Sequence, residues 1–457
     1  MDREPAVAVL DIGKSNAKLA LVEPASRSVI AIRTTGNAVL RDGPYPHFDV
    51  ERLWQWLVEG LLVLSQRARI TAISTTTHGA CMALLAGDRL AMPILDYEYE
   101  GPESVRRDYG AARGDFAETL SPDLPNGLNA GRQLYWQARA FPDAFAGVDT
   151  ILPYPQYWVW RLCGAKVAEA TSLGCHTDLW NPRVGTFSRL ATNEGWVRLF
   201  PRLVKPWEVA GQLRPEVAEE AGLPADCQVL TGIHDSNASL YPHLVARQPP
   251  FAVLSTGTWM VVFAPGGSID RLDPRRDCLA NVDAFGRAVP SARFMAGREF
   301  ALLAGENGEP SEADVRRVVG EGIMALPTFA PGTGPFASRT GDWTRDPAAL
   351  SGEERTVAAS LYAALVAETC LDLTGADGPI IVEGPLSRNR LFLAALASLT
   401  RRAVIRRTDA TGTTDGAALL ALGPAPRSDD RTEPVSVAPL EIDIGGYAAA
   451  WRERAGG

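Results

Sequence analysis

The sequence contains very little lysine and no concentrated basic run. Only four of its 457 residues are lysine (Lys14, Lys18, Lys166 and Lys205), and the formal net charge is −9. Proteins that bind nucleic acid or anionic membranes usually present a positively charged patch, so neither partner is expected. The six cysteines are scattered without a CxxC pair, which argues against a zinc or redox motif and favours a reduced, cytoplasmic protein.

Long apolar runs are also missing. The first residues, Met-Asp-Arg-Glu, lead into a short apolar strand that cannot serve as the core of a signal peptide. No stretch approaches the roughly 20 apolar residues that cross a bilayer. The content of 46% hydrophobic and 22% charged residues is typical of a soluble globular protein, and the length predicts two domains.

Strand-like and helix-like segments alternate along the chain. Residues 50–69 carry an apolar stripe at helical spacing, and the strand-like ITAISTT follows them. Further helices are predicted after Pro155, over 354–374, and over 388–400 with Ser387 as N-cap, and PIIVEG is predicted to be a buried strand. This alternation predicts an α/β protein with parallel or mixed sheets. Residues 246–250 form the candidate domain junction, and the tail after Pro424 is expected to wrap the surface or fray.

The opening stretch, AVAVLDIGKSNAKLALVE, contains Gly13-Lys14-Ser15, the tripeptide that closes many P-loops. A P-loop needs a glycine five positions earlier and a helix directly afterwards. The earlier position is Ala8, and the residues that follow alternate as in a strand. The pattern therefore excludes a P-loop and predicts two strands joined by a tight polar turn.

A second stretch, FAVLSTGTWMVVFAP (residues 251–265), has the same plan as the first. When the two are aligned, Asp11 matches Ser255, Gly13 matches Gly257, and Lys14 matches Thr258. Turns of small and hydroxyl residues expose backbone N–H groups that can bind phosphate oxygens. The repeat predicts two related domains whose turns grip one triphosphate from opposite sides.

Six segments, in order, resemble motifs of the FGGY family of carbohydrate kinases, in the actin/Hsp70/sugar-kinase superfamily. They are DIGKSN, STGT, TGIHDSNASLY, LPTFAPGTGPFASRTGDW, IVEGPLSRNRLFLAALASLT and TTDGAALLAL. The resemblance runs from Val7 to about Leu422. It implies two ribonuclease H-like domains, 1–246 and 247–425, with the active site in the cleft between them and a tail over 426–457.

The resemblance also implies where the nucleotide binds. The expected phosphate contacts are Gly13, Lys14, Ser15, Asn16, Thr256, Gly257 and Thr258, although Lys14 can equally be an exposed turn lysine. Gly384 and Asn389 belong to the adenosine motif. That motif usually opens with consecutive glycines, whereas here it reads Glu383-Gly384-Pro385, which removes an N–H and brings a negative charge near the nucleotide.

Phosphoryl transfer to a sugar hydroxyl needs a carboxylate base and a metal-bound triphosphate. Asp235 follows a predicted strand and has small neighbours, so we expect it to be the base; the alternative is a helix cap. Asp11 ends its strand at the first turn, and we expect it to bind Mg²⁺ through water; the alternative is a turn-stabilising aspartate.

For the sugar, the candidate contacts are His78, Gly79 and Asp96. An imidazole suits a hydroxyl as donor or acceptor, and the resembling family places a His-Gly segment at its sugar site. Tyr97 and Tyr99 could stack on the ring or simply pack. His176 and Asp178 are expected to be structural, and His234 has no second metal ligand at suitable spacing.

The sequence thus predicts a kinase that uses ATP and Mg²⁺ to phosphorylate a small sugar. A ketose of L-rhamnulose or L-fuculose type is favoured, with xylulose, ribulose and glycerol as alternatives. Two other readings stay open: a nucleotide-dependent switch without sugar kinase activity, and a relative that only binds sugar. A homodimer is also left open.

Overall fold

The computed structural model describes residues 4–305, 308–407, 412–427 and 435–456. The chain divides into two compact units. Unit 1 consists of Met1–Arg247, Ala280–Ala288 and Thr411–Asp429, and unit 2 of Gln248–Leu279, Val289–Ala410 and Asp430–Gly457. The linear division after residue 246 stays a prediction; the packing adds that two short later segments fold with unit 1.

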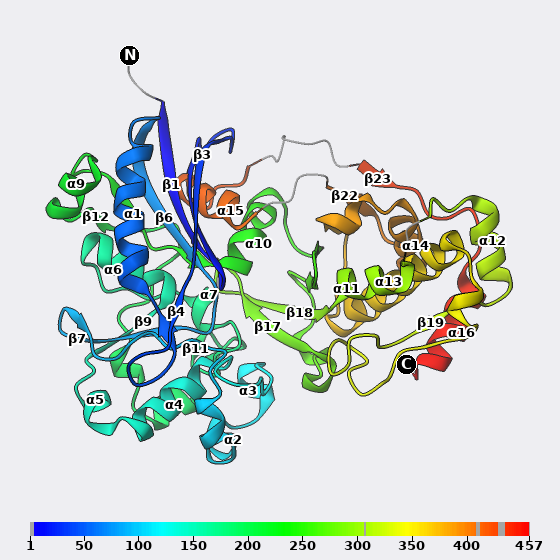
Figure 1. Ribbon diagram of the computed structural model, residues 1–457, viewed down its shortest axis with the longest axis horizontal. Helices are drawn as coiled ribbons and strands as arrows, with labels where there is room; N and C mark the ends of the chain where they lie inside the picture. The colour runs from blue at the N-terminus through cyan, green and yellow to red at the C-terminus, as the bar shows by residue number, and fades with distance from the viewer. Residues whose placement is uncertain (1–3, 306–307, 408–411, 428–434, 457) are drawn as a thin grey trace. The chain divides into compact units, whose positions relative to one another are not determined.

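The sheet of unit 1 is mixed. Its strand order is β12-β13-β6-β1-β2-β3, and β14 also pairs with β6 (Figure 1). β1, β2 and β3 form an antiparallel meander, whereas β1, β13 and β14 each run parallel to β6. The strands are β1 (Pro5–Ile12), β2 (Asn16–Val22), β3 (Val29–Gly36), β6 (Arg69–Thr77), β12 (Val209–Gln212), β13 (Gln228–Leu230) and β14 (Ile233–His234).

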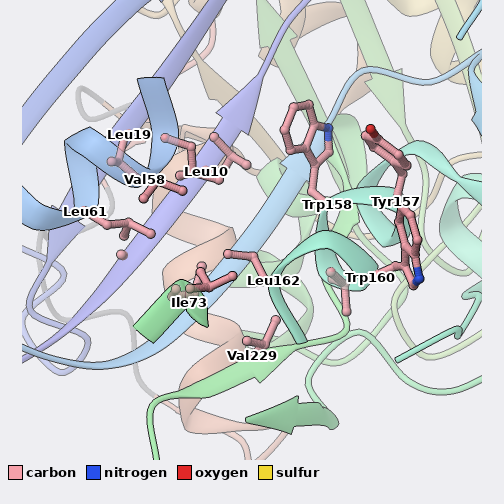
Figure 2. Close-up of a cluster of buried hydrophobic side chains, with 14 of the residues drawn as sticks. Leu10, Leu19, Val58, Leu61, Ile73, Tyr157, Trp158, Trp160, Leu162 and Val229 are labelled. Carbon is pink, nitrogen blue, oxygen red and sulfur yellow. The ribbon is translucent and has the colours of Figure 1, made fainter. Parts of the chain in front are cut away.

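Helices pack against this sheet through apolar stripes. Asp49 caps α1 by accepting the Arg52 N–H at 3.1 Å, and the helix begins at Val50 as predicted. Figure 2 shows side chains of β1, β2, β6 and α1 meeting in one cluster, with Trp158 beside them. The helices that belong to the sheet's connections are α1 (Val50–Leu64), α6 (Tyr154–Cys163), α9 (Pro215–Ala221), α10 (Asp235–Ala246) and α15 (Thr413–Leu419).

A second group of elements in unit 1 supports the loop that follows Asp96. Gln133, on α4, donates to the carbonyls of Ala80 and Gly127, and the Gly127 N–H donates to the Tyr97 carbonyl at 2.9 Å. The remaining elements are β4 (Val39–Leu40), β5 (His47–Phe48), β7 (Met82–Ala86), β8 (Arg89–Leu90), β9 (Thr150–Pro153), β10 (Trp180–Asn181), β11 (Thr186–Phe187), α2 (Arg106–Arg113), α3 (Phe116–Thr119), α4 (Ala130–Ala140), α5 (Pro142–Ala146), α7 (Ala170–Leu173) and α8 (Arg189–Asn193).

The sheet of unit 2 repeats the plan of unit 1. From β18 its order is β18-β16-β15-β21-β22-β23, with β18, β16 and β15 antiparallel and β15, β21 and β22 parallel. β15 and β16 therefore correspond to β1 and β2, and β21 corresponds to β6. The strands are β15 (Ala252–Thr256), β16 (Met260–Phe263), β18 (Ala288–Phe294), β21 (Ile380–Glu383), β22 (Val404–Arg406) and β23 (Val435–Val437).

The helix α13 is the central helix of unit 2. By length and composition it could cross a membrane, so the expectation that no stretch approaches this length was wrong; 83% of its most apolar window is buried inside the protein. A capping box between Ser351 and Glu354 starts it. The other elements are α11 (Ala296–Ala304), α12 (Glu312–Gly320), α13 (Gly352–Leu373), α14 (Arg390–Thr400), α16 (Gly445–Ala455), β19 (Ala325–Leu326), β20 (Asp342–Trp343) and β17 (Cys278–Val282), which includes residues of both units.

Two local predictions in unit 2 were wrong. Ser387 is not the N-cap of the predicted helix, because Pro385–Arg388 forms a 3₁₀ turn and α14 begins after Asn389. The tail was expected to wrap the surface or fray, yet α16 packs into unit 2, with Trp451 1% exposed and its indole N–H bonded to the Ala325 carbonyl at 2.7 Å. Residues 428–434 of that tail lie outside the described residues.

Arg132 offers a test of how α4 holds the loops beside it. Its side chain is fully buried and pairs with Glu103 at 2.9 Å and Asp123 at 2.6 Å. Replacing it with methionine should lower the free energy of unfolding by about 3 kcal/mol, because buried carbonyls lose their donor and the two acids keep only Arg106 as their arginine partner. Urea denaturation followed by circular dichroism measures this.

Arg107 is the matched control, because its side chain is 96% exposed although it also contacts an acid, Asp108. Arg107→Ala should change the unfolding free energy by no more than about 0.5 kcal/mol. Equal effects of the two substitutions would show that the Arg132 network does not support the loops.

Candidate functional site

The carboxyl ends of three strands of unit 1 meet at one edge of its sheet. β1 runs parallel to β6 with Asp11 opposite Thr76, and β14, which directly precedes Asp235, pairs in parallel with the last residues of β6. His78 follows the end of β6, and its N–H donates to the carbonyl of Ile12 at 2.8 Å. Three residues predicted from the sequence, Asp11, His78 and Asp235, therefore lie at the same edge.

Asp235 is the first residue of α10, and its two carboxylate oxygens differ. Oδ1 accepts the Ser236 N–H at 2.5 Å and the Ser236 hydroxyl at 3.2 Å, and lies 3.2 Å from His234 Nε2. Oδ2 has no hydrogen bond to any residue in the described part of the chain. Since 28% of the side chain is exposed, the protein holds one oxygen and leaves the other accessible.

The protonation states at this edge follow from burial. The pKa of Asp235 is raised to about 6: burial is the largest cause and the negative charge of Asp11 adds to it, while His78 and the Ser236 hydrogen bonds oppose the rise. Burial lowers the pKa values of His78 and His234 to about 4. At neutral pH the carboxylate is ionised and both imidazoles are neutral.

His78 presents an unused acceptor. Its Nδ1 lies 2.8 Å from the Gly79 carbonyl, which can only accept, so the ring proton is on Nδ1 and Nε2 carries the lone pair. That Nε2 is buried and has no hydrogen-bond partner within the described residues. The rings of Phe48, Tyr97 and Tyr154 hold the imidazole, with centroids 5.1, 5.3 and 5.2 Å away.

Gly79, predicted as a sugar contact, has a packing reason to be glycine. A Cβ at this position would lie 2.9 Å from His234 Nε2, the atom that faces Asp235. The sequence analysis found no role for His234, and its contact with Asp235 depends on this close approach. The sequence shows that His234 precedes Asp235, but only the folded structure shows that the two side chains are in contact.

Lys14 and Asp96, predicted as a phosphate contact and a sugar contact, are partners in the structure. The Lys14 ammonium donates to Asp96 Oδ1 and lies 3.3 Å from Glu98 Oε2. It also lies 5.0 Å and 4.9 Å from the ring centroids of Phe48 and Tyr97. The ammonium is therefore engaged on the side of the candidate sugar contacts.

Asp11 is 8% exposed and holds a hydrogen-bond cluster that the sequence analysis missed. Its Oδ2 accepts from Lys18 Nζ at 3.1 Å, Thr413 Oγ1 at 2.5 Å and Thr414 Oγ1 at 3.0 Å. The two threonines open α15, whose sequence was noted only for its small residues. Their hydroxyls, at the first two positions of a helix, were the available signal.

The first turn is closed by its own backbone. The Gly13 N–H donates to the Asn16 carbonyl at 2.9 Å, and Asn37 bonds the carbonyls of Gly13 and Ser15 at 2.9 and 2.8 Å. Ser15 and Asn16 are exposed. These hydrogen bonds hold the turn in place, and it presents two polar residues to solvent, as a phosphate contact requires.

The chemistry of Asp11 can be compared with the needs of a metal ion. Within the residues that the structure describes, there is no group of three or more His, Cys, Asp or Glu side chains placed to hold one. A single carboxylate suits Mg²⁺, which keeps several waters and takes further oxygens from phosphates. The residues therefore fit a largely hydrated Mg²⁺ and do not fit an ion held by protein ligands alone.

In unit 2, the second turn is joined to the start of the adenosine motif. The Thr256 hydroxyl donates to the Glu383 carbonyl and accepts the Leu386 N–H at 3.1 Å, so its hydrogen bonds already serve the fold. Gly257 and Thr258 follow in the turn, and Thr258 is exposed. Of this predicted set, the exposed turn residues are the ones placed to meet a phosphate.

Gly384 and Asn389 also have structural duties. Gly384 has a φ of +82°, and a Cβ there would lie 1.9 Å from the Thr256 carbonyl oxygen. Asn389 caps α14: its Oδ1 accepts the Phe392 N–H at 2.9 Å, and its Nδ2 donates to Ser360 Oγ at 2.9 Å. Both ends of the Asn389 amide are therefore engaged.

A cavity of about 750 Å³ opens beside Asn389 within unit 2. This volume lies within the range typical of small-ligand pockets. Part of its lining lies in the adenosine motif, and the sequence did not indicate the rest, which comes from segments far apart in the chain. The lining residues are Gly308, Glu309, Pro310, Ser311, Glu312, Val315, Thr356, Ser360, Arg388, Asn389, Arg390, Leu391, Ala394, Pro439, Leu440, Glu441 and Ile442.

Comparisons with known proteins agree with this arrangement. A carbohydrate kinase from Novosphingobium aromaticivorans is 37% identical, with a TM-score of 0.91 over 100% of this chain and 99% of that one. The L-fuculokinase of Salmonella typhi is 24% identical over 59% of this chain, and the L-xylulose/3-keto-L-gulonate kinase of Escherichia coli (strain K12) is 24% identical over 63% of it. The chain spans 58% of the length of each of these two curated kinases.

Family models match most of the chain. Residues 6–241 match the N-terminal domain of the FGGY family of carbohydrate kinases, and residues 248–430 match the carbohydrate kinase FGGY C-terminal domain. The predicted fold class, two ribonuclease H-like α/β domains of the actin-like ATPase type, is confirmed together with the predicted resemblance. The protein belongs to the FGGY family of carbohydrate kinases.

Proposed function

We propose that this protein transfers the γ-phosphate of ATP to a hydroxyl of a small neutral ketose, a deoxyketohexose of L-rhamnulose or L-fuculose type. Family membership supports phosphoryl transfer to a sugar, and the similarity to an L-fuculokinase supports this substrate class. The observation that carries the proposal is the accessible Oδ2 of Asp235, at the same sheet edge as Asp11 and as His78, whose buried Nε2 has no hydrogen-bond partner within the described residues.

Asp235 acts as the general base in this proposal. The attacking hydroxyl donates to Oδ2 and passes its proton there as its oxygen bonds to the γ-phosphorus, while the bond from that phosphorus to the bridging oxygen breaks and ADP leaves. His234 and Ser236 hold Oδ1, so the carboxylate cannot rotate and Oδ2 stays directed outward. Fixing the base in this way contributes orientation rather than new chemistry.

His78 orients the sugar. Its neutral imidazole offers a lone pair on Nε2, which accepts a second hydroxyl of the substrate. The buried ring does not need to rotate, because Phe48, Tyr97 and Tyr154 pack around it. Asp96 offers a further acceptor on the same side.

Each unit would supply its own contacts to the nucleotide. Ser15 and Asn16, with Gly257 and Thr258, would donate to phosphate oxygens. The cavity beside Asn389 would take the adenosine. Asp11 would hold Mg²⁺ through coordinated water, and the ion would neutralise charge on the triphosphate. A cytoplasmic location belongs to the same proposal, and a homodimer stays a prediction.

A nucleotide-dependent switch is the alternative from another class. Such a protein would need the phosphate turns but neither a base with an open oxygen nor an open imidazole acceptor beside it. Both features favour the kinase. Xylulose, ribulose and glycerol remain alternative substrates within the same machinery.

The substrate is tested by ADP release over a panel. Neutral members are L-rhamnulose, L-fuculose, L-xylulose, D-xylulose, ribulose and glycerol; acidic members are gluconate and 3-keto-L-gulonate. One neutral ketose should raise the rate of ADP release at least about 100-fold above the rate with ATP and Mg²⁺ alone, because a sugar hydroxyl held beside the base reacts with the phosphate much faster than water does. A rate that no sugar changes would contradict the proposal and favour the switch.

Asp235→Asn should lower kcat about 10³-fold and change KM for ATP little, because it removes the base and keeps the shape. The control is Asp226→Asn, an exposed aspartate of the same unit. Since burial raises the pKa of Asp235 from 3.8 to about 6, wild type loses stability as pH rises from about 4 to about 6, so Asp235→Asn should be more stable than wild type at pH 8 and equally stable near pH 4. Full activity in Asp235→Asn would refute the mechanism.

The pH profile provides a separate test. Because the base must be ionised and its pKa is raised to about 6, kcat/KM should fall about tenfold per pH unit below pH 6 and stay level from 7 to 8. His234→Phe removes the ring nitrogen that lies 3.2 Å from Asp235 Oδ1, so the fall should begin at higher pH. His234→Gln, which keeps an N–H, is the control and should preserve the wild-type profile. An unchanged profile in His234→Phe would show that this contact does not hold the base.

A further inference from the structure

We propose that Lys14 is a specificity residue of the sugar site, and that its ion pair with Asp96 makes the site accept neutral sugars and reject sugar acids. This inference rests on the proposed function and names the substrate class more narrowly. It also moves Lys14 from the phosphate side, where the resemblance expects it, to the sugar side.

The contacts of Lys14 hold its ammonium in place. Its ammonium has an acid partner in Asp96 and a second acid, Glu98, at 3.3 Å, with two aromatic rings within 5.0 Å. Its side chain is 21% exposed and that of Asp96 is 8% exposed. A lysine held by two acids and two rings in a partly buried setting is not available to follow a phosphate.

The Lys14–Asp96 pair lies beside His78. The two rings that hold the ammonium, Phe48 and Tyr97, are the rings that also pack against the imidazole of His78. Lys14 and His78 therefore share one wall. The unpartnered Nε2 of His78 and the Lys14–Asp96 pair are therefore neighbours.

Asp96 is fixed so that one oxygen remains for a ligand. Its Oδ1 accepts from Lys14 and from the Glu98 N–H at 3.2 Å. Its backbone is held on both sides, through the Pro46 carbonyl at 3.0 Å and the Tyr99 N–H at 2.9 Å. Oδ2 has no hydrogen bond to any described residue, so it can accept a sugar hydroxyl while Lys14 donates to a neighbouring one.

The charges decide which ligand fits. Asp96 and Glu98 compensate the one positive charge of Lys14, Lys18 compensates Asp11, and Asp235 adds a further negative charge at the same edge. A sugar hydroxyl can donate a hydrogen bond to these carboxylates or accept one from the Lys14 ammonium. A carboxylate on the substrate meets net negative charge and a cation that is already paired, so the site discriminates against it.

Asp96→Asn separates these effects because it keeps the size of the side chain and removes its charge. The Lys14 ammonium then keeps the exposed Glu98 as its acid partner, loses the buried one, and becomes a partner for a substrate carboxylate. Glu98→Gln is the matched control, because it removes an equally charged neighbour whose side chain is 64% exposed and screened by water.

The experiment measures kcat/KM of wild type, Asp96→Asn, Glu98→Gln and Lys14→Met for the neutral ketoses and the sugar acids of the panel. Asp96→Asn should raise the acid-to-neutral ratio at least tenfold, and Glu98→Gln should change it less than threefold. Lys14→Met should raise KM for the ketose at least tenfold and leave KM for ATP within threefold of wild type. Thermal melting verifies that each variant is folded.

An unchanged ratio in folded Asp96→Asn overturns the inference. A rise in KM for ATP in Lys14→Met, without change for the sugar, also overturns it and returns Lys14 to the phosphates. Titration calorimetry of the same sugars against wild type and Asp96→Asn gives the ratio without turnover. Wild type that turns over no sugar therefore contradicts the proposed function, while the binding ratio still decides the role of the pair.

Discussion

The candidate chemistry of this protein depends on the parallel pairing of β1 and β14 with β6. Parallel strands end at the same edge, so residues separated by more than two hundred positions in the chain, Asp11 and Asp235, come together without any contact of their own. His78 follows the strand between them. The antiparallel side of the sheet contributes differently, because the β1–β2 turn carries Lys14 back toward the same region. The sheet thus supplies both the acids and the cation from backbone geometry alone.

Local patterns in the sequence were enough to predict the site residues that directly follow a strand. Asp235 and His78 each directly follow a strand-like run, and that position is visible without tertiary structure. The partner of Lys14 was not visible in the same way, because Asp96 lies 82 residues away and neither residue has a local pattern that links them. The same limit applies to Thr413 and Thr414, whose hydroxyls reach Asp11 across some four hundred residues.

Unit 2 shows why residue type alone can mislead about a binding role. Asn389 lies in a motif associated with the nucleotide, and it borders a cavity large enough for one, but its amide is used to cap α14 and to bond Ser360. Helix boundaries in this region were displaced for a related reason: Pro385 begins a 3₁₀ turn before the helix can start. The α/β alternation itself was predictable, since it depends on periodic apolar positions. The tail was not, because Trp451 finds its partners only in the folded unit.

The two equivalent sheets differ at one pair of neighbouring positions. In unit 1 the acid Asp11 on the first strand lies opposite the hydroxyl residue Thr76, and in unit 2 the hydroxyl residue Ser255 lies opposite the acid Glu383. The acid and the hydroxyl have exchanged strands between the halves. If the halves descend from a duplicated ancestor, each copy has kept a single carboxylate in this pair of facing residues. The carboxylate lies on the first strand in unit 1 and on the neighbouring parallel strand in unit 2.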